Sequence, residues 1–234
     1  MRAQSHVVGF ALIVGLGVLA LGTLTLSVGT VMDSQTSTAD ATRVAEDMSE
    51  TLQVVERTGI HSNRVTFAEG RLSTAERTLR VLDNGTVVHE IDVGALVFER
   101  DEVRVAGVVG AVVRGGAGHA WLPPITSSER NEVLVVGAPV LNASHVSISG
   151  RGGVTTTLQT DVSHTRTKLG NGSYAVTIET ETPGPFERYF EQRNATTTRR
   201  SFPGDEYDSV VVHFPGERVG YLVVHDVDLE VRDG

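Results

Sequence analysis

The chain has 234 residues, and its 29 acidic and 20 basic side chains give a formal net charge of −9 at neutral pH. Nucleic-acid phosphates demand a basic protein face, so this composition argues against a nucleic-acid partner. The chain contains no cysteine, which excludes disulfides and cysteine-ligated metal sites and leaves the burial of apolar side chains to hold a fold together.

An uncharged apolar run extends from Val7 to Met32, close to the N-terminus. A hydrocarbon layer about 30 Å thick is crossed by about 20 apolar residues in an α-helix, so the run is long enough to span a membrane. It is too long for the apolar core of a secretory signal, and no A-x-A-like cleavage site follows it. We therefore expect a transmembrane helix that stays with the chain. Arg2 and the α-amino group lie on the short side, which points the remainder outward.

Small residues are spaced four apart at two places in this run, Ala11 with Gly15 and Thr25 with Gly29. Such pairs let transmembrane helices approach closely, so these four residues are candidate helix-packing positions. The same spacing also arises from the ordinary composition of membrane helices, which are rich in glycine. The pattern alone therefore leaves open whether this helix associates with others.

The opening residues, MRAQSHVVGFALIVGLGVLALGTLTLSVGT, resemble the class III signal and hydrophobic N-terminus of archaeal type IV pilins and archaellins. In that family, a membrane prepilin peptidase removes a short basic leader, and the helix serves as both membrane anchor and filament core. The resemblance implies that the leader ends at Ala3 and that the mature chain begins at Gln4. Bacterial type IV pilins carry glutamate at the fifth mature position, which here is Val8, so the charge-pairing role of that glutamate is not carried over.

The later chain contains the stretches VVRGGAGHAWLPP, ISGRGGVTTTLQTDVSH and FPGERVGYLVVHDVDLEV. With these it resembles an uncharacterised haloarchaeal family of pilin-like proteins that have a β-rich ectodomain, a resemblance that implies no activity. Composition agrees with such a source, because lysine occurs once, at Lys168, and acidic, lysine-poor surfaces suit high salt. A GC-rich genome that encodes arginine in place of lysine explains the same bias.

A second helical pattern follows the apolar run. Apolar residues recur at Val44, Met48, Leu52 and Val55, which is the spacing of one helical face. Gly59 is a suitable end for this helix, because glycine takes the left-handed conformation without a Cβ penalty. The apolar stripe needs a cover, which is either the β domain of the same chain or neighbouring helices in an assembly.

After this helix the apolar pattern changes to period two, which predicts β-strands. Asn84-Gly85 lies between two such runs and is the strongest two-residue hairpin signal. Glycine, proline or asparagine bounds most runs, and long alternating helices are absent, which favours an antiparallel sandwich or open barrel. One later helix is predicted over Gly184–Arg193. The other predicted strands cover residues 95–98, 103–113, 133–136, 145–149, 154–160, 174–180, 209–214 and 221–231.

The expected fold class is therefore α+β, with a long N-terminal transmembrane helix followed by a mainly antiparallel β-sandwich or open-barrel domain. We expect a leader peptide at residues 1–3, the hydrophobic helix and its polar extension at residues 4–58, and an extracellular β-rich domain at residues 59–234. The last segment is long enough for one packed domain and short for two.

Four of the six asparagines head N-x-S/T sequons, namely Asn84, Asn142, Asn171 and Asn194. As glycan acceptors they would lie on exposed loops, which again places the domain outside the cytoplasm. Alternatively, asparagine in N-G and N-A turns beside Ser/Thr-rich strands produces such triplets without any glycan.

No pattern in the sequence predicts catalysis, a cofactor or a metal site. The eight histidines never fall at H-x-H or H-x-x-x-H spacing, no G-x-S-x-G is present, and GVVGAVVRGGAG lacks the GK[ST] ending of a phosphate loop. Asp205, Glu206 and Asp208 lack the glycine and distal glutamate of an EF-hand, and they predict a solvated acidic turn. We expect neither enzymatic activity nor a cofactor.

These features predict a pilin-like cell-surface protein with a structural or adhesive role, anchored or assembled through its N-terminal helix. The expected partners are membrane lipid, the prepilin peptidase and, in an assembly, other pilin-like subunits. The expected location is the cell membrane, crossed once with the C-terminal domain outside, or a surface filament. The alternative is a single-pass anchored extracellular binding or adhesion domain that never polymerises, and an extracellular hydrolase is a third hypothesis.

Overall fold

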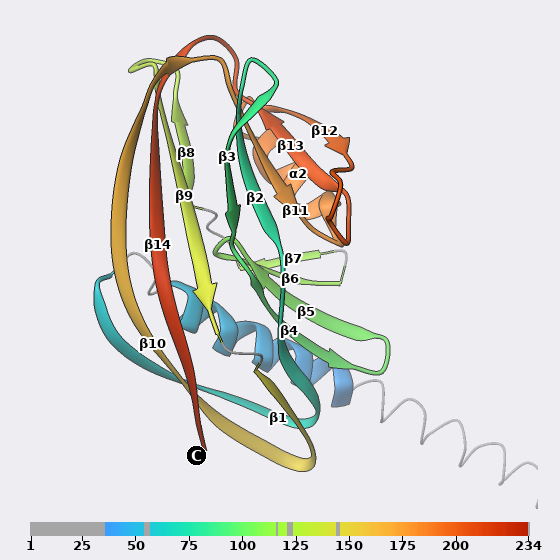
Figure 1. Ribbon diagram of the computed structural model, residues 1–234. Helices are drawn as coiled ribbons and strands as arrows, with labels where there is room; N and C mark the ends of the chain where they lie inside the picture. Colours follow the sequence, from blue (N-terminus) through green and yellow to red (C-terminus); the bar gives the residue numbers. More distant parts are fainter. Residues whose placement is uncertain (1–35, 54–56, 116, 121–123, 144–145, 234) are drawn as a thin grey trace, which may run out of the picture. The chain divides into compact units, whose positions relative to one another are not determined.

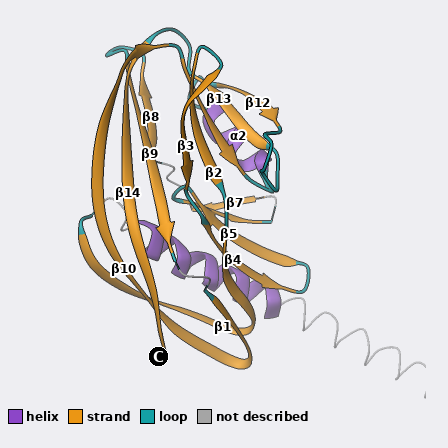
Figure 2. Ribbon diagram, viewed as in Figure 1, coloured by secondary structure: helices purple, strands orange, loops and turns teal. Residues whose placement is uncertain are grey.

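The computed structural model describes residues 36–53, 57–115, 117–120, 124–143 and 146–233 (Figure 1). The chain divides into two compact units, Met1–Ala39 and Asp40–Gly234, and the second unit holds both β-sheets. Figure 2 shows that strands dominate the described elements.

The protein is mainly β, so the α+β prediction is wrong. Strands account for 64% of the structure, and the described residues contain two helices, at residues 36–53 and α2 (Pro183–Glu191). Among the described residues, neither helix is long and apolar enough to cross a membrane. The run from Val7 to Met32, and the transmembrane helix predicted for it, lie outside the described residues. The strands outweigh the helices because several extend well beyond the apolar residues that mark them in the sequence.

The larger sheet has nine strands. Its strands are, in order across the sheet, β7 (Ala117–Ala120), β6 (Ala111–Arg114), β5 (Val103–Val108), β4 (Ala95–Arg100), β1 (Gly59–Ala75), β10 (Ser147–Gly172), β14 (Arg218–Asp233), β9 (Val133–Asn142) and β8 (Ile125–Ser128). Neighbouring strands are antiparallel except β14 and β9, which run parallel. The long strands β1, β10 and β14 form its centre, and β10 curves strongly along its length (Figure 1).

The smaller sheet has five antiparallel strands. They are, in order, β12 (Thr196–Arg200), β13 (Ser209–His213), β11 (Tyr174–Glu179), β2 (Thr78–Asp83) and β3 (Thr86–Asp92). The hairpin predicted at Asn84-Gly85 is confirmed, and it joins β2 to β3. Both turn residues have positive φ, at 48° and 79°, as a type I′ turn requires.

The two sheets share one hydrophobic core. Leu79 and Val176 of the smaller sheet belong to the same buried cluster as Val97 and Leu134 of the larger one. Helix α2 adds Phe186, which is fully buried in this cluster. The short helix predicted over Gly184–Arg193 is therefore present and contributes to the core.

A second core lies under the first helix, which crosses the strands of the larger sheet (Figure 1). Val44 and Met48 are fully buried, and with Leu52 they share a cluster with Phe98 of β4. The predicted apolar stripe is confirmed for these three helical residues, whereas Val55 lies outside the described residues. Of the two covers considered for the stripe, the structure has the β domain of the same chain.

Two aspartates of this helix bind the backbone of β1. Asp40 Oδ2 accepts a hydrogen bond from Ala68 N at 3.1 Å, and Asp47 Oδ2 accepts one from Thr66 N at 3.0 Å. Asp40 also pairs with Arg100 of β4, at 2.7 Å from its Nη1. Burial raises the pKa of Asp47, because its charged form loses water. These contacts fix the helix on β1 and β4.

Two strand predictions differ from the structure in where the chain turns. The run 103–113 was predicted as one strand, but Val109 and Gly110, with φ of 49° and 74°, form a turn between β5 and β6. A β-branched residue rarely takes positive φ, so the sequence pattern conceals this turn. Conversely, residues 145–149 and 154–160 were predicted as separate strands, whereas β10 runs from Ser147 through the whole second segment and pairs with β1 and β14.

Candidate functional site

An open cavity of about 610 Å³ lies beside β2 and β3, and six carboxylate residues and two arginines contribute to its lining. Strand β2 supplies Arg80, β3 supplies Glu90, and β11 supplies Glu179. The loop between β12 and β13 closes one side with Asp205 and Glu206. Residues far apart in the chain thus form one charged site, which the sequence patterns did not reveal.

Arg80 is the main organising residue of this cavity. Its Nη1 and Nη2 donate to the two carboxylate oxygens of Asp205 at 2.8 and 2.6 Å, and its Nε donates to Glu90 Oε2 at 2.9 Å. The hydrogen bonds to Asp205 raise the pKa of Arg80. The guanidinium also lies 4.4 Å from the ring centroid of Phe202, a cation–π contact.

The prediction of a solvated acidic turn is wrong for one of its three residues. The Asp205 side chain is only 3% exposed, because it pairs with buried Arg80. Glu206, by contrast, is 65% exposed. The one sequence signal for this pair was an arginine inside the apolar run Leu79-Arg80-Val81-Leu82, which indicates a buried cation in need of a carboxylate.

Glu179 attaches the β12–β13 loop to the smaller sheet. Its carboxylate accepts hydrogen bonds from the backbone N–H groups of Thr78 at 3.0 Å, Glu206 at 2.9 Å and Tyr207 at 3.3 Å. Arg77 adds an ion pair to Glu206 at 2.9 Å, and its guanidinium lies 4.6 Å from the Tyr207 ring centroid. Through these contacts, the buried side chains of Glu179 and Arg77 hold the β12–β13 loop in place.

The charged lining allows this cavity to bind polar or cationic groups. Glu76 and Asp92 are exposed at its edge, and its carboxylates outnumber its arginines. Within the part of the chain that the structure describes, no group of three or more His, Cys, Asp or Glu side chains is arranged to hold a metal ion. The contacts of the buried charges accordingly indicate a structural cluster with an acidic rim.

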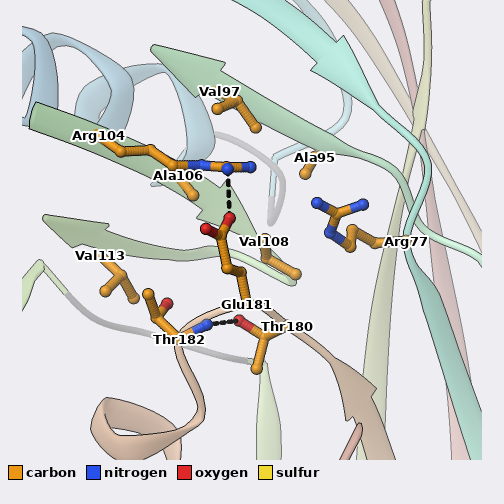
Figure 3. Close-up of a pocket in the computed structure, with 10 residues that line it drawn as sticks. All are labelled: Arg77, Ala95, Val97, Arg104, Ala106, Val108, Val113, Thr180, Glu181 and Thr182. Carbon is orange, nitrogen blue, oxygen red and sulfur yellow. Dashed lines mark hydrogen bonds and ion pairs between the residues drawn. The ribbon is translucent and has the colours of Figure 1, made fainter. Parts of the chain in front are cut away.

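A smaller cavity, of about 20 Å³, lies between β4, β5 and the segment that precedes α2 (Figure 3). Arg104 points across it and pairs with Glu181, while Arg77 lies on the other side (Figure 3). Arg104 also contacts Glu99 at 3.4 Å, and its buried Nε has no hydrogen-bond partner among the described atoms. This space holds about one water molecule, so it is too small to bind a substrate.

The four sequon asparagines are all exposed. Asn84 lies in the β2–β3 hairpin, Asn171 near the end of β10, Asn142 at the end of β9, and Asn194 between α2 and β12. Asn84 N donates to Ser173 O at 3.0 Å, which brings the sequons of Asn84 and Asn171 together at one end of the smaller sheet. The positions suit glycan acceptors, which need accessible side-chain amides.

Three of the sequon amides donate to a nearby carboxylate. The pairs are Asn84 Nδ2 to Asp83 at 3.1 Å, Asn142 Nδ2 to Asp226 at 2.5 Å and Asn171 Nδ2 to Glu217 at 2.9 Å. A glycan bond to Nδ2 replaces one of its two hydrogens, so one N–H remains for each of these contacts. Asn142 also contributes to the lining of the charged cavity, so a glycan attached to it would lie beside the acidic rim.

We expect the native protein to carry a glycan on Asn84, because this residue is exposed at the tip of a hairpin. Mass spectrometry of its peptide should show a mass increment that disappears equally in Asn84→Gln and Thr86→Ala, since both changes destroy the sequon. Asn131→Gln, at an exposed asparagine outside any sequon, is the matched control and should leave the glycan mass unchanged. Finding Asn84 unmodified in the native protein would contradict the prediction.

The other predicted functional residues fall outside the described part of the chain. They are the processing residues Ala3 and Gln4 and the helix-packing residues Ala11, Gly15, Thr25 and Gly29.

Comparison with known proteins gives one result. A search of curated proteins and a search of solved structures each found no match. A family model matches residues 2–230, a range that includes both the apolar N-terminal run and the β-rich domain. The chain belongs to this family, a family of unknown function designated DUF7289.

Proposed function

We propose that this protein is a pilin-like cell-surface protein, held in the membrane or assembled through its apolar N-terminal run, that displays its β-rich domain outside the cell. Its role is structural or adhesive, and its partners are membrane lipid, the prepilin peptidase and other pilin-like subunits. The observation that carries the proposal is the uncharged run from Val7 to Met32, which begins soon after a short proposed leader that contains one arginine.

Three features of the β-rich domain support display at the cell surface. Its four sequon asparagines are exposed, its two sheets share one core as in a β-sandwich, and its fold needs no cysteine. A domain without cysteine has no thiol to oxidise outside the cell. The acidic net charge favours solubility at high salt.

The chain's own sheet covers the apolar stripe of the first helix, which leaves fewer surfaces through which subunits can associate. The residues at 40–53 that form an apolar stripe are buried against the chain's own sheet, so this stripe is not available to a neighbouring subunit. Subunits that associate through helices therefore do so through the apolar run from Val7 to Met32, where the small residues Ala11 and Gly15 allow close packing.

The first test of the proposal is the N-terminus of the mature protein. We expect mass spectrometry of surface material to find a chain that starts at Gln4, and a prepilin-peptidase deletion strain to retain Met1. Removal of the three leader residues also lowers the mass of the intact protein, which the same measurement detects. A surface protein that keeps Met1 or Arg2 in the wild-type strain would refute the processing step.

The second test separates assembly from simple anchoring. The double variant Ala11→Leu/Gly15→Leu should abolish filaments seen by electron microscopy, because the larger side chains prevent close helix approach. Val14→Leu, a change between two large apolar side chains, is the control and should leave filaments intact. An unchanged assembly state in the double variant would favour the alternative, an anchored binding domain, for which the acidic cavity of about 610 Å³ is the candidate binding surface.

A further inference from the structure

Two histidines face each other across neighbouring strands of the larger sheet. His164 of β10 and His225 of β14 are direct partners in the strand register. Their Nδ1 atoms lie 2.9 Å apart, and their ring centroids are 4.9 Å apart with the planes at 85°. His164 is exposed, whereas His225 is buried at 7% exposure. The two imidazoles are therefore paired at the boundary between solvent and the sheet.

An open cavity of about 350 Å³ adjoins this pair. Its lining contains the two histidines with Thr58, Pro124, Thr126, Val135, Gly137 and Val223. None of these eight lining residues is acidic, so the imidazoles are the strongest metal ligands among them. Imidazole suits copper, nickel and zinc, whereas calcium and magnesium prefer carboxylate oxygens.

We propose that His164 and His225 bind one divalent transition-metal ion, copper(II) best, through their Nδ1 atoms. Metal–imidazole bonds are about 2.0–2.1 Å long, so two nitrogens at a right angle around one ion lie about 2.9 Å apart, against about 3.4 Å for a tetrahedral ion. The observed distance of 2.9 Å is that of a hydrogen bond between the rings, and it is close enough to the right-angle spacing of tetragonal copper(II) and nickel(II) sites for a small ring rotation to reach that geometry. Copper(II) binds such nitrogen ligands more strongly than the other divalent first-row metals.

Binding requires a small rearrangement of the pair. Without metal, one Nδ1 donates its hydrogen to the other. With metal, the lone pairs of both Nδ1 atoms must face the ion. The proton of the donor ring moves to its own Nε2 through solvent, so a neutral pair binds the ion with no net loss of protons. Rotation about χ2 aims both nitrogens at the ion, and this torsion is soft in histidine. Water in the open cavity completes the coordination.

The sequence alone does not reveal this site, because the two histidines are far apart in the chain. The antiparallel register of β10 and β14 brings them together. Cross-strand partners have Cβ atoms about 4.5–5.5 Å apart, which is short enough for both side chains to reach one ion.

The test is titration of the metal-free, full-length protein in detergent with copper(II), by calorimetry and electron paramagnetic resonance. A His6→Ala background removes the histidine nearest the N-terminal amine, which would otherwise compete for copper. We expect one copper per chain and a spectrum with hyperfine splitting from two nitrogens. His164→Ala and His225→Ala should each weaken binding by about tenfold or more, since changes that only support a ligand already cost that much.

His213→Ala provides the matched control, because His213 is an exposed strand histidine of the smaller sheet. It should leave the copper affinity unchanged. Circular dichroism checks the folding of each variant. If His225→Ala does not fold, the copper affinity of His164→Ala and the wild-type spectrum decide whether the pair binds copper. The proposal is overturned if the wild type binds no stoichiometric copper, as for a pair that only shares a proton, or if binding survives both substitutions.

Discussion

Replacing Met48 by alanine is expected to lower the free energy of unfolding by about 2–5 kcal/mol. Met48 is fully buried in the core between the first helix and the larger sheet. The helix sits directly on the backbone of β5, since a Cβ atom at Gly107 would lie only 3.2 Å from Met48 Cε. Truncation of Met48 therefore leaves a cavity between the helix and the sheet. Denaturant unfolding of the full-length protein measures the effect.

Glu46→Ala is the matched control for this prediction, because Glu46 is exposed on the same helix. Its effect should stay within about 0.5 kcal/mol. Since the chain's own sheet covers Met48, the loss of stability should not depend on protein concentration. A loss below about 1 kcal/mol, or one that grows on dilution, would instead indicate that neighbouring subunits cover the helix.

Replacing Asp205 by alanine is expected to destabilise the protein by about 3–5 kcal/mol, because it leaves a buried guanidinium without its main partner. The side chains of Arg80 and Asp205 are only 4% and 3% exposed, and two hydrogen bonds join them. The remaining partner of Arg80 is Glu90, whose side chain is 58% exposed. Because Glu90 contacts solvent, it compensates the buried charge of Arg80 only weakly. Denaturant unfolding of the full-length protein again gives the free energy.

Two further variants separate this ion pair from simple loss of packing. Glu90→Gln should cost about 1 kcal/mol or less, since exposed ion pairs contribute little. The double variant Arg80→Met/Asp205→Leu should recover most of the lost stability, because two apolar side chains of similar size need no partner charge. If the double variant is as unstable as Asp205→Ala, the loss comes from the shape of the β12–β13 loop and not from the unpaired arginine.

Short-range patterns predicted several elements correctly. The Asn84-Gly85 hairpin, the helix at Gly184–Arg193 and the apolar stripe of Val44, Met48 and Leu52 each depend on residues a few positions apart. Turn conformation, helix periodicity and the choice of buried face are local properties of the chain. The sequence therefore contained enough information for these elements, as well as for the four sequons.

The fold class was predicted wrongly because strand length is not a local property. Strands β1 and β10 have 17 and 26 residues, and β10 reaches this length because it pairs with β1 along residues 147–162 and with β14 along residues 156–172. Its polar residues and glycines do not look like a strand in isolation. The parallel pairing of β14 with β9 is likewise decided by the path of the whole chain.

The sequence by itself determined the composition, the apolar N-terminal run, the glycosylation motifs and the local elements, because each is written in neighbouring residues. Only the tertiary structure decided what covers the first helix, which arginine meets Asp205 and which histidine meets His164. Arg80 and Asp205 are 125 positions apart, and such contacts follow from strand register. The energy of a buried charge or a paired imidazole depends on that partner, so it emerges only once the sheets have assembled.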